Sequence, residues 1–483
     1  MKKQTPKVFT YQSRPVLNSA SNAILDLYGM LYGKVERTLF TDLQKGKELN
    51  TLKREYLLQF GITARQFNGC RMTLQGKIDS VKECGLLRIE ELKETIAALE
   101  KKLPKIRSKL KKHVKHRKLV SLKQKLASLE LEKEKGQVSL CFGGKKLFHA
   151  QYNLEKNGYS SLEEWKKDWE QARSSEFFCI GSSDETSGNQ SCVLTFNKED
   201  KATLFLRLPN CFIESYGKYL QITEIDFAYG QKEIIEALAE KIALSYRFKK
   251  DKKGWRVFVS LVRDRVKIVT TDCNGAIGLD VNSDHLALVE TDRHGNPIDK
   301  KTISLVTYGK TKAQAQAMIG DACKEVIALC KEKGKILVIE QLDFKKKKTT
   351  LKDLPHKLAR MLSSFSYGQI LTGLERKGFC EGVQVHSVNP AMTSIIGRIK
   401  FSKRYGLSSH HGAALCIARR YYRFTEAPSK SAMIVVYKNA QVTCPLPERK
   451  RRQHVWAFWK KANEKLKAAL AVHSRASFYP SNR

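Results

Sequence analysis

Two strand-like segments that each end in a carboxylate constrain this chain more than any other feature. Segment 276–281 reads Ala-Ile-Gly-Leu-Asp-Val and carries Asp280 near its end. Segment 335–340 reads Lys-Ile-Leu-Val-Ile-Glu, so Glu340 directly follows four apolar residues that are typical of a fully buried strand. A carboxylate at the end of a buried strand is costly to desolvate unless a cation compensates its charge. Two of them on neighbouring strands would form a divalent-metal site.

The order of elements around these acids predicts an RNase H-like fold, in which three leading strands precede alternating helices and strands. In that fold the first and fourth strands are neighbours, so Asp280 and Glu340 would face each other. Hard oxygen ligands suit Mg²⁺, with Mn²⁺ as an alternative, and two such ions can drive phosphodiester hydrolysis. The predicted elements are strands 276–281, 286–290 and 302–306, helix 312–333, strand 335–340, helix 355–378, strand 383–388 and helix 407–422.

The last of these helices offers a third ligand. His410 and His411 stand at its start, where a carboxylate would be usual. Imidazole can coordinate Mn²⁺, and Mg²⁺ less readily, or act as a general acid or base. A helix-capping or surface histidine is the ordinary alternative. Asp284 and His285 offer further donors close to Asp280 in sequence, and His411 is an additional candidate for the site.

The net charge points to a polyanionic partner. The 483 residues include 88 Lys and Arg against 49 Asp and Glu, which gives a formal charge of +39. Nucleic acid is the commonest polyanion, and an anionic membrane surface is the rival. We expect no membrane partner, because the sequence has no apolar run of about 18 residues and no signal peptide. The expected location is the cytoplasm of a prokaryote, or the nucleus in a eukaryote.

The cysteines argue against a thiolate zinc site. All twelve are scattered singly, and no Cys-x-x-Cys pair occurs. Several lie within apolar runs, as small buried residues do in a reducing compartment. We therefore expect no structural zinc.

The chain before the RNase H-like part divides into a helical and a strand-rich region. Segment 1–15 holds one strand, 16–136 has helical periodicity, and 137–272 has short strands separated by turns, as in a small barrel or sandwich. The first strand is predicted to join that barrel, which makes the helical region an insertion. The nuclease-like region is 273–425, and 426–483 is a basic C-terminal segment.

The helical region contains a basic stretch without acids. Between Lys101 and Leu129 there are twelve Lys and Arg and no Asp or Glu, and Pro104 predicts a helix kink or the turn of a hairpin. A solvated helix face is the ordinary interpretation, but the acidic partners that stabilise such a face are missing. We therefore favour a phosphate-contacting arm. Its predicted contacts are Lys101, Lys102, Lys105, Arg107, Lys109, Lys111, Lys112, Lys115, Arg117 and Lys118.

A second predicted nucleic-acid surface lies in the strand-rich region. Lys249 and Lys250 stand beside Trp255, and basic residues beside an aromatic ring suit stacked nucleotides. An ordinary hairpin surface is an equal alternative.

Three segments resemble the split RuvC motifs of TnpB, the transposon-encoded RNA-guided nuclease related to the compact type V CRISPR effectors. They read Gly-Leu-Asp-Val-Asn-Ser-Asp-His, Leu-Val-Ile-Glu-Gln-Leu-Asp-Phe-Lys-Lys and Ser-Ser-His-His-Gly-Ala-Ala-Leu-Cys-Ile-Ala-Arg-Arg. The segment 388–394, Val-Asn-Pro-Ala-Met-Thr-Ser, is similar to the one that precedes the family's third motif. The resemblance is specific across about 275–425 and weaker upstream.

The resemblance implies a multidomain α+β protein with a RuvC (RNase H-like) α/β nuclease domain, a β-barrel wedge domain and a helical recognition lobe. Asp280 matches the first catalytic acid and Glu340 the second, whereas the third position falls on His410. The family's zinc-ribbon cysteines are absent, since only Cys380 lies between the second and third motifs. The chain therefore resembles a divergent branch with a rearranged site.

The implied function is that of a Mg²⁺-dependent endonuclease, a monomer that pairs a guide RNA with double-stranded target DNA beside a short flanking motif. The further predicted nucleic-acid contacts are Lys345, Lys346, Arg419 and Arg420, although a solvated loop is an equal interpretation for the two lysines. Two rivals remain open. One is a nuclease-inactive RNA-guided repressor, and the other is a guide-independent RuvC-like nuclease or transposase.

Overall fold

The computed structural model describes residues 6–136, 138–183, 186–341, 367–427, 433–437, 440–444, 447 and 454–476. The chain forms two compact units. The N-terminal unit is Thr5–Arg263, and the C-terminal unit is Asp264–Arg483 together with Met1–Gln4. No helix of the described chain is long and apolar enough to cross a membrane.

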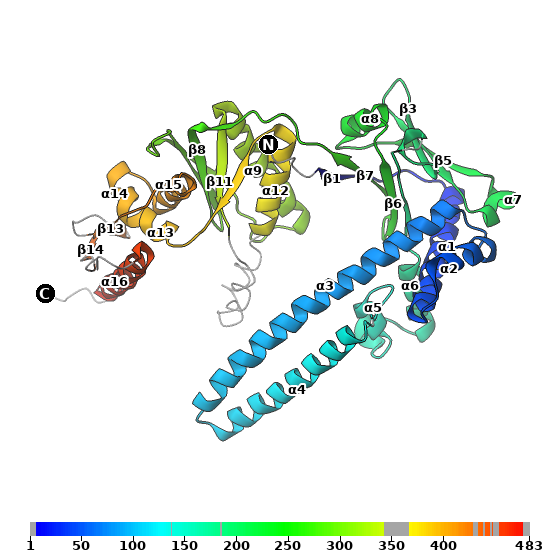
Figure 1. Ribbon diagram of the computed structural model, residues 1–483, viewed down its shortest axis with the longest axis horizontal. Coiled ribbons are helices and arrows are strands. Elements are labelled where there is room, and N and C mark those ends of the chain that lie inside the picture. Colours follow the sequence, from blue (N-terminus) through cyan, green and yellow to red (C-terminus); the bar gives the residue numbers. More distant parts are fainter. Residues whose placement is uncertain are drawn as a thin grey trace. The chain divides into compact units, whose positions relative to one another are not determined.

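The strands of the N-terminal unit form two antiparallel sheets (Figure 1). Along β7 the side chains alternate between buried and half-buried, so one face of the first sheet packs against the core while the other is more open to solvent. The first strand, β1, pairs with β7 along its whole length. The first sheet has the order β1 (Lys7–Ser13), β7 (Gly254–Arg263), β6 (Leu244–Asp251), β2 (Glu176–Cys179), and the second has β3 (Cys192–Phe196), β4 (Ala202–Arg207), β5 (Tyr219–Ile225).

A long helical hairpin extends from this unit (Figure 1). Helix α3 (Ala64–Lys102) begins with a capping box and ends at a 3₁₀ turn, Leu103–Lys105, after which α4 (Lys109–Glu134) runs back. Pro104 lies in that turn, so of its two predicted roles the hairpin turn is confirmed. The other helices of the unit are α1 (Ser19–Gln44), α2 (Leu49–Gln59), α5 (Lys145–Ala150), α6 (Leu162–Arg173), α7 (Ile213–Tyr216) and α8 (Gln231–Ala239).

Apolar contacts and ion pairs hold the two arms of the hairpin together. Ile96 and Leu99 of α3 pack against Leu119 of α4. The ion pairs Lys93–Glu130, at 2.7 Å, and Lys123–Glu100, at 2.8 Å, also join the two helices. These contacts form a helix-pair seam within the region predicted to be helical.

The C-terminal unit is built on a five-stranded sheet of order β10-β9-β8-β11-β12. Strand β9 is antiparallel to β8, whereas β11 is parallel to both β8 and β12. This order of three leading strands and two later ones is the predicted RNase H-like topology. The strands are β8 (Thr271–Val281), β9 (His285–Thr291), β10 (Pro297–Ser304), β11 (Lys335–Glu340) and β12 (Val385–Val388).

Helices cover both faces of this sheet. Ile277 and Ile339 point to one face, where they join a core with α9 (Lys312–Lys333) and α12 (Tyr367–Glu381). Ala276 and Val338 point to the other face, against α15 (Ser409–Tyr421). Strands buried on both faces are apolar throughout, which is why these runs do not alternate with polar residues. The first part of predicted helix 355–378 lies outside the described residues.

One of the remaining elements, α16 (Val455–Ala476), packs on the outside of α15. Phe458 and Trp459 of α16 share a core with Leu415 and Cys416 of α15. Trp459 also donates through Nε1 to the backbone oxygen of Glu426 at 2.9 Å. The others are α13 (Thr393–Ile396), a π-helical turn Gly397–Phe401, α14 (Ser402–Tyr405), β13 (Met433–Tyr437) and β14 (Ala440–Cys444).

Two glycines let α15 approach its neighbours closely. A Cβ atom on Gly278 of β8 would lie 2.1 Å from the backbone oxygen of Ala414. A Cβ on Gly412 would lie 2.6 Å from the backbone oxygen of Gly397. Because backbone atoms cannot move aside cheaply, these positions require glycine, and they set the distance from α15 to β8 and to the π-helical turn.

We predict that Gly278→Ala destabilises the protein by about 1–3 kcal/mol or more, because the added methyl group clashes with the α15 backbone. Gly320→Ala in α9 is the matched control, since a Cβ at Gly320 meets nothing within 4 Å. Removing this glycine from a helix interior should stabilise the fold by about 0.5–1 kcal/mol. Urea unfolding measures both changes, and an unchanged midpoint for Gly278→Ala would contradict the close packing.

Candidate active site

Two carboxylates meet at one edge of the central sheet. Strands β8 and β11 pair in parallel with Leu279 opposite Ile339, and Asp280 and Glu340 are the next residue on each strand. The carboxyl ends of parallel strands are where ligands bind in open α/β sheets. Asp280 is only 7% exposed, so its charge is largely removed from solvent. The sheet thus brings together the first two predicted site residues.

His410 lies against Asp280. It occupies the first turn of α15, and its Nδ1 is 3.2 Å from Oδ2 of Asp280. This hydrogen bond raises the pKa of His410 above its ordinary value, and the nearby charge of Asp284 acts in the same direction. Asn282 Nδ2 donates to the same Asp280 oxygen at 3.1 Å. The Asp280 carboxylate is therefore compensated by an imidazole and an amide of its own chain.

Glu340 is held by two residues that sequence reasoning missed. The hydroxyl of Thr393 donates to Oε1 of Glu340, and Tyr367 donates its hydroxyl to the Glu340 backbone oxygen at 2.5 Å. Burial raises the pKa of Tyr367, and the charges of Glu340 and then Asp280 raise it further, so both carboxylates act on this phenol. Thr393 lies in the segment that resembles the family's approach to its third motif, whereas no sequence signal marked Tyr367.

A second histidine, His285, packs edge-on against His410. His285 and His410 have ring centroids 4.9 Å apart at an interplanar angle of 82°. Nδ1 of His285 lies 2.7 Å from Oδ1 of Asp284, and this contact lowers the pKa of Asp284. Asp284 therefore contacts His285, its charge also raises the pKa of His410, and its own side chain is 65% exposed. Sequence reasoning named both Asp284 and His285 as further donors close to Asp280.

His411 faces away from the carboxylates, so the prediction that it belongs to the site is wrong. Its Nδ1 lies 2.8 Å from the hydroxyl of the helix-capping Ser408. Its Nε2 lies 3.1 Å from the hydroxyl of Thr302 on β10. Successive residues of a helix point about 100° apart, so only one of the two histidines can reach Asp280. Burial lowers the pKa of His411.

The donor atoms fit a divalent ion held by two carboxylates. In the described chain, no group of three or more His, Cys, Asp and Glu side chains is arranged to hold one metal ion. His410 contacts Asp280 directly, so it does not complete a protein cage in this geometry. Mg²⁺ is commonly bound by one or two carboxylates, with water and substrate phosphates as its other ligands. Asp280 and Glu340 match that arrangement.

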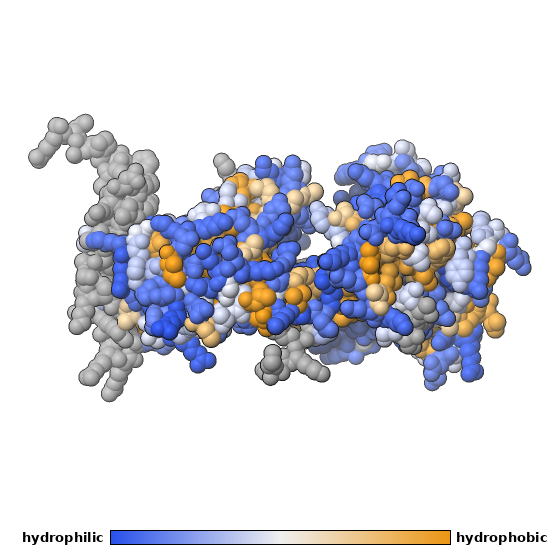
Figure 2. All heavy atoms as spheres, turned by 90° about the horizontal axis from the view of Figure 1, so that it is seen from above, coloured by the Kyte–Doolittle hydropathy of each residue, from blue (hydrophilic) through white to orange (hydrophobic). Residues whose placement is uncertain are grey.

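The basic tip of the hairpin, residues 101–118, is largely exposed, which a solvated helix face and a phosphate-contacting arm both require. Its lysines and arginines form no ion pair with any Asp or Glu of the described residues. Hydrophilic residues cover most of the molecular face seen in Figure 2, with apolar residues in scattered groups. The tip is the densest run of unpaired cations that sequence reasoning singled out.

The predicted surface around Trp255 is corrected by the structure. Trp255 is 1% exposed, and its Nε1 donates to Asp26 Oδ1 at 3.0 Å. The strand alternation of β7 turns this ring into the core, where it cannot stack on a nucleotide. The ammonium of Lys250 binds the same carboxylate at 2.7 Å. Of the three predicted residues only Lys249 is open to solvent, at 55% of its side chain.

The arginines at the end of α15 also have structural partners. Arg419 donates to Glu426 at 2.5 Å, and its guanidinium lies 4.6 Å from the centre of the Phe424 ring. Arg420 donates to the backbone oxygen of Asn389. Arg419 is only 16% exposed, so its predicted nucleic-acid contact is corrected to a packing role. Lys345 and Lys346 lie outside the described residues.

Comparison with known proteins found no matching family model and no matching curated protein. Among solved structures, RuvC of T. thermophilus in complex with a Holliday junction substrate is 17% identical, over 31% of this chain and 94% of that one, with a TM-score of 0.22. A Cas12f1–sgRNA–target DNA complex is 13% identical over 86% and 100%, with a TM-score of 0.25. A CRISPR-Cas12f ternary complex is 10% identical over 85% and 98%, with a TM-score of 0.20. Because each TM-score is below 0.5, we derive the chemistry from this chain's own geometry.

We predict that the His410–Asp280 pair makes stability depend on pH. The pKa of His410 is raised in the folded state, so its contribution is fully present below the ordinary value of about 6.5 and is lost as pH rises through the folded-state value. His410→Gln should lower the free energy of unfolding at pH 6 by no more than about 1 kcal/mol, because solvent screens a pair whose imidazole is 46% exposed. Urea unfolding at pH 6 and pH 9 measures the change.

The control for this measurement is His411→Gln. The pKa of His411 is lowered by burial, so its neutral form is the stabilising one and its contribution is lost as pH falls. The two variants should therefore show opposite pH dependence. Equal losses at both pH values for His410→Gln would contradict an ionic contact with Asp280.

Proposed function

We propose that this chain is an RNA-guided DNA endonuclease that hydrolyses phosphodiesters with Mg²⁺ at Asp280 and Glu340. The observation that carries the proposal is the placement of these two acids at the ends of adjacent central strands, with His410 against Asp280. Mn²⁺ is the alternative ion, and a bound pair of such ions would activate water and stabilise the leaving oxygen.

The residues around the acids have separate roles in this proposal. Asp280 and Glu340 hold the ion, and Thr393 orients the Glu340 carboxylate through its hydroxyl. His410 compensates the charge of Asp280 before the ion binds and stands where a proton can be exchanged with substrate. His285 packs edge-on to His410 and limits the orientations of its ring. The site therefore offers one fixed anionic pair and one titratable cation.

The N-terminal unit supports the nucleic-acid part of the proposal. Under this proposal 16–136 is the recognition lobe, 1–15 and 137–272 form the wedge domain, and 273–425 is the nuclease domain. The pairing of β1 with β7 supports the lobe as an insertion between wedge strands. The charge of +39 and the unpaired cations of the basic tip supply a surface for the phosphates of a guide RNA. The segment 426–483 is assigned to the nuclease domain or to an RNA contact.

One alternative is an RNA-guided repressor that binds matched DNA without cutting it. His410 in the place of a third acid favours it, because the described residues do not form a three-ligand cage. The intact Asp280 and Glu340 pair favours cleavage. A guide-independent nuclease or transposase would have no need of the long basic hairpin. Cleavage assays separate the three functions.

We predict that the purified complex with its co-expressed RNA cuts matched double-stranded DNA in Mg²⁺ or Mn²⁺ and not in EDTA. Asp280→Asn and Glu340→Gln should reduce cleavage to background, because each removes a metal-binding carboxylate. Thr393→Val should reduce the rate by about 10–100-fold, as is typical for partners that orient a metal ligand. Gel analysis of end-labelled DNA measures the rates.

The pair His410→Gln and His411→Gln isolates the role of the third position. His410→Gln should slow cleavage and change its pH profile, whereas His411→Gln should match the parent, since it contacts Ser408 and Thr302. Tight binding of matched DNA without cutting in either metal would support the repressor. A complex that carries no RNA would rule out both guided functions.

We predict that the basic tip determines how RNA binding depends on salt. Lys111→Gln with Lys112→Gln should weaken RNA binding, and the slope of log K against log salt should fall by about 0.7 for each phosphate that the arm no longer neutralises. The control, Lys198→Gln with Lys201→Gln, removes the same charge from the β3–β4 turn. Filter binding from about 50 to about 500 mM salt, which is one decade, tests this. Equal effects of both variants would contradict a specific arm.

A further inference from the structure

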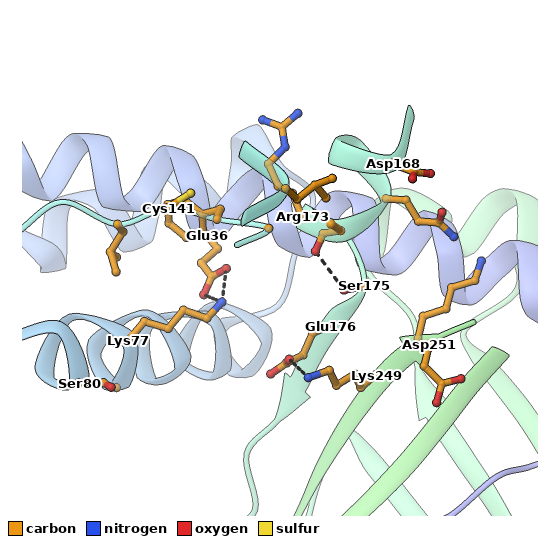
Figure 3. Close-up of a pocket in the computed structure, with 18 of the residues that line it drawn as sticks. Glu36, Lys77, Ser80, Cys141, Asp168, Arg173, Ser175, Glu176, Lys249 and Asp251 are labelled. Carbon is orange, nitrogen blue, oxygen red and sulfur yellow. Dashed lines mark hydrogen bonds and ion pairs between the residues drawn. The ribbon is translucent and has the colours of Figure 1, made fainter. Parts of the chain in front are cut away.

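The N-terminal unit contains a large cavity that the proposed nuclease chemistry does not use. It has a volume of about 880 Å³ and lies between α1, α3, α6 and the ends of β2 and β6 (Figure 3). Ligand pockets commonly enclose about 300–1,000 Å³. The cavity is therefore large enough for a nucleotide.

One wall of the cavity combines apolar side chains with an ion pair between a buried glutamate and a partly exposed lysine. Val81, Leu140 and Phe142 form its apolar part. The ammonium of Lys77 binds both oxygens of Glu36, at 2.6 and 2.8 Å, and lies 5.7 Å from the centre of the Phe142 ring. Figure 3 shows Glu36 and Lys77 meeting at one side of the open space. The wall offers an aromatic face beside a charged donor and a carboxylate.

The opposite wall carries lysines that are weakly paired or unpaired. Lys249 lies 3.8 Å from Glu176, and its side chain is 55% exposed. Lys252 forms no ion pair with any described residue, and it lies at the exposed turn after β6. Figure 3 shows Glu176 and Lys249 across the open space from Glu36 and Lys77. This side of the cavity offers ammonium groups to an anion.

The loop that closes the cavity is held in place by packing. Gly143 has φ of +89°, and a Cβ there would lie 2.9 Å from the Trp169 ring and 3.1 Å from Arg173. This glycine therefore lets the loop 140–143 lie directly on α6. The apolar wall is preformed, which lowers the entropy cost of binding a ligand.

We propose that this cavity binds one nucleotide of a single-stranded nucleic acid, with the base against Phe142 and the phosphate near Lys249 and Lys252. The mixed lining decides the ligand class. A free phosphate or an acidic peptide has no use for carboxylates in its site, whereas a nucleobase carries both donors and acceptors beside its apolar faces. Base contact with aromatic rings is how single strands are held without sequence preference. This inference rests on the proposed function, because that function makes nucleic acid the partner of the protein.

The test fills the cavity without disturbing the core. Gly76 of α3 lines the cavity, and a Cβ there meets nothing within 4 Å, so Gly76→Trp places a large ring in the open space. Gly85→Trp is the matched control, because Gly85 lies on the same helix, also has nothing within 4 Å, and does not line the cavity. Both changes remove a glycine from a helix interior, so neither should impair folding.

The full-length protein is titrated with fluorescein-labelled trinucleotides of RNA and of DNA, and binding is followed by fluorescence anisotropy. Gly76→Trp should weaken trinucleotide binding about tenfold or more, which is 1.4 kcal/mol per factor of ten. Gly85→Trp should stay within about twofold of the parent, less than 0.5 kcal/mol on the same scale. A preference between the two probes identifies the natural strand. Equal affinities for the parent and Gly76→Trp would overturn the inference, as would displacement of the probe by a hepta-glutamate peptide.

DNA cleavage is measured on the same preparations, so that the two proposals can fail separately. Guided cleavage by the parent with no effect of Gly76→Trp on trinucleotide binding would overturn the cavity alone. The other outcome is that the parent does not cleave DNA but binds the trinucleotide, and that Gly76→Trp removes this binding. That outcome would support nucleotide binding in the cavity and overturn the proposed nuclease function.

Discussion

The parallel pairing of β8 with β11 is the contact on which the candidate site depends. It joins two segments sixty residues apart and sets Asp280 beside Glu340 at one end of the sheet. Both strands are buried on both faces, by α9 and α12 on one side and α15 on the other. A shift of one residue in this pairing would turn every side chain of a strand to the wrong face, so the core fixes the position of the acids.

In the proposed metal site, a histidine in place of a third acid changes the electrostatics. Three acids in one place would repel one another until a cation bound, whereas Asp280, Glu340 and a protonated His410 carry a net charge of only −1. Asp280 raises the pKa of His410, so the compensating charge is strengthened by the contact itself. In the proposed site, the same ion pair would compete with the metal ion for Asp280. Such a site would bind metal less tightly but be more stable without metal. The hydrogen bond from Asn282 to Asp280 adds to the stability of the metal-free state.

The cations of the N-terminal unit include some that form ion pairs with buried or partly buried acids and others that form no ion pair with the described residues. Lys77 and Lys250 are bound to Glu36 and Asp26, where they support the packing of α1 against the sheet and α3. The cations of the basic tip have no such partners among the described residues. Only cations of the second kind release counterions when a polyanion binds. The net charge of the sequence therefore overestimates the number of cations that are available to contact nucleic acid.

The sequence alone determined the strand order of the C-terminal unit and the placement of Asp280 and Glu340 at neighbouring strand ends. It also marked Pro104 as a helix kink or a hairpin turn, and His410 as a third ligand or an ordinary helix-start histidine. These follow from local signals, namely continuous apolar runs, the missing N–H of proline and residues at element ends. Only the tertiary structure decided which side chains face inward. In the folded chain Trp255 lies in the core, and His411 contacts Ser408. Arg419 pairs with Glu426. Tyr367 and Thr393 both donate hydrogen bonds to Glu340. The physical reason is that direction and partner depend on register and on packing between segments far apart in the chain, which periodicity does not encode.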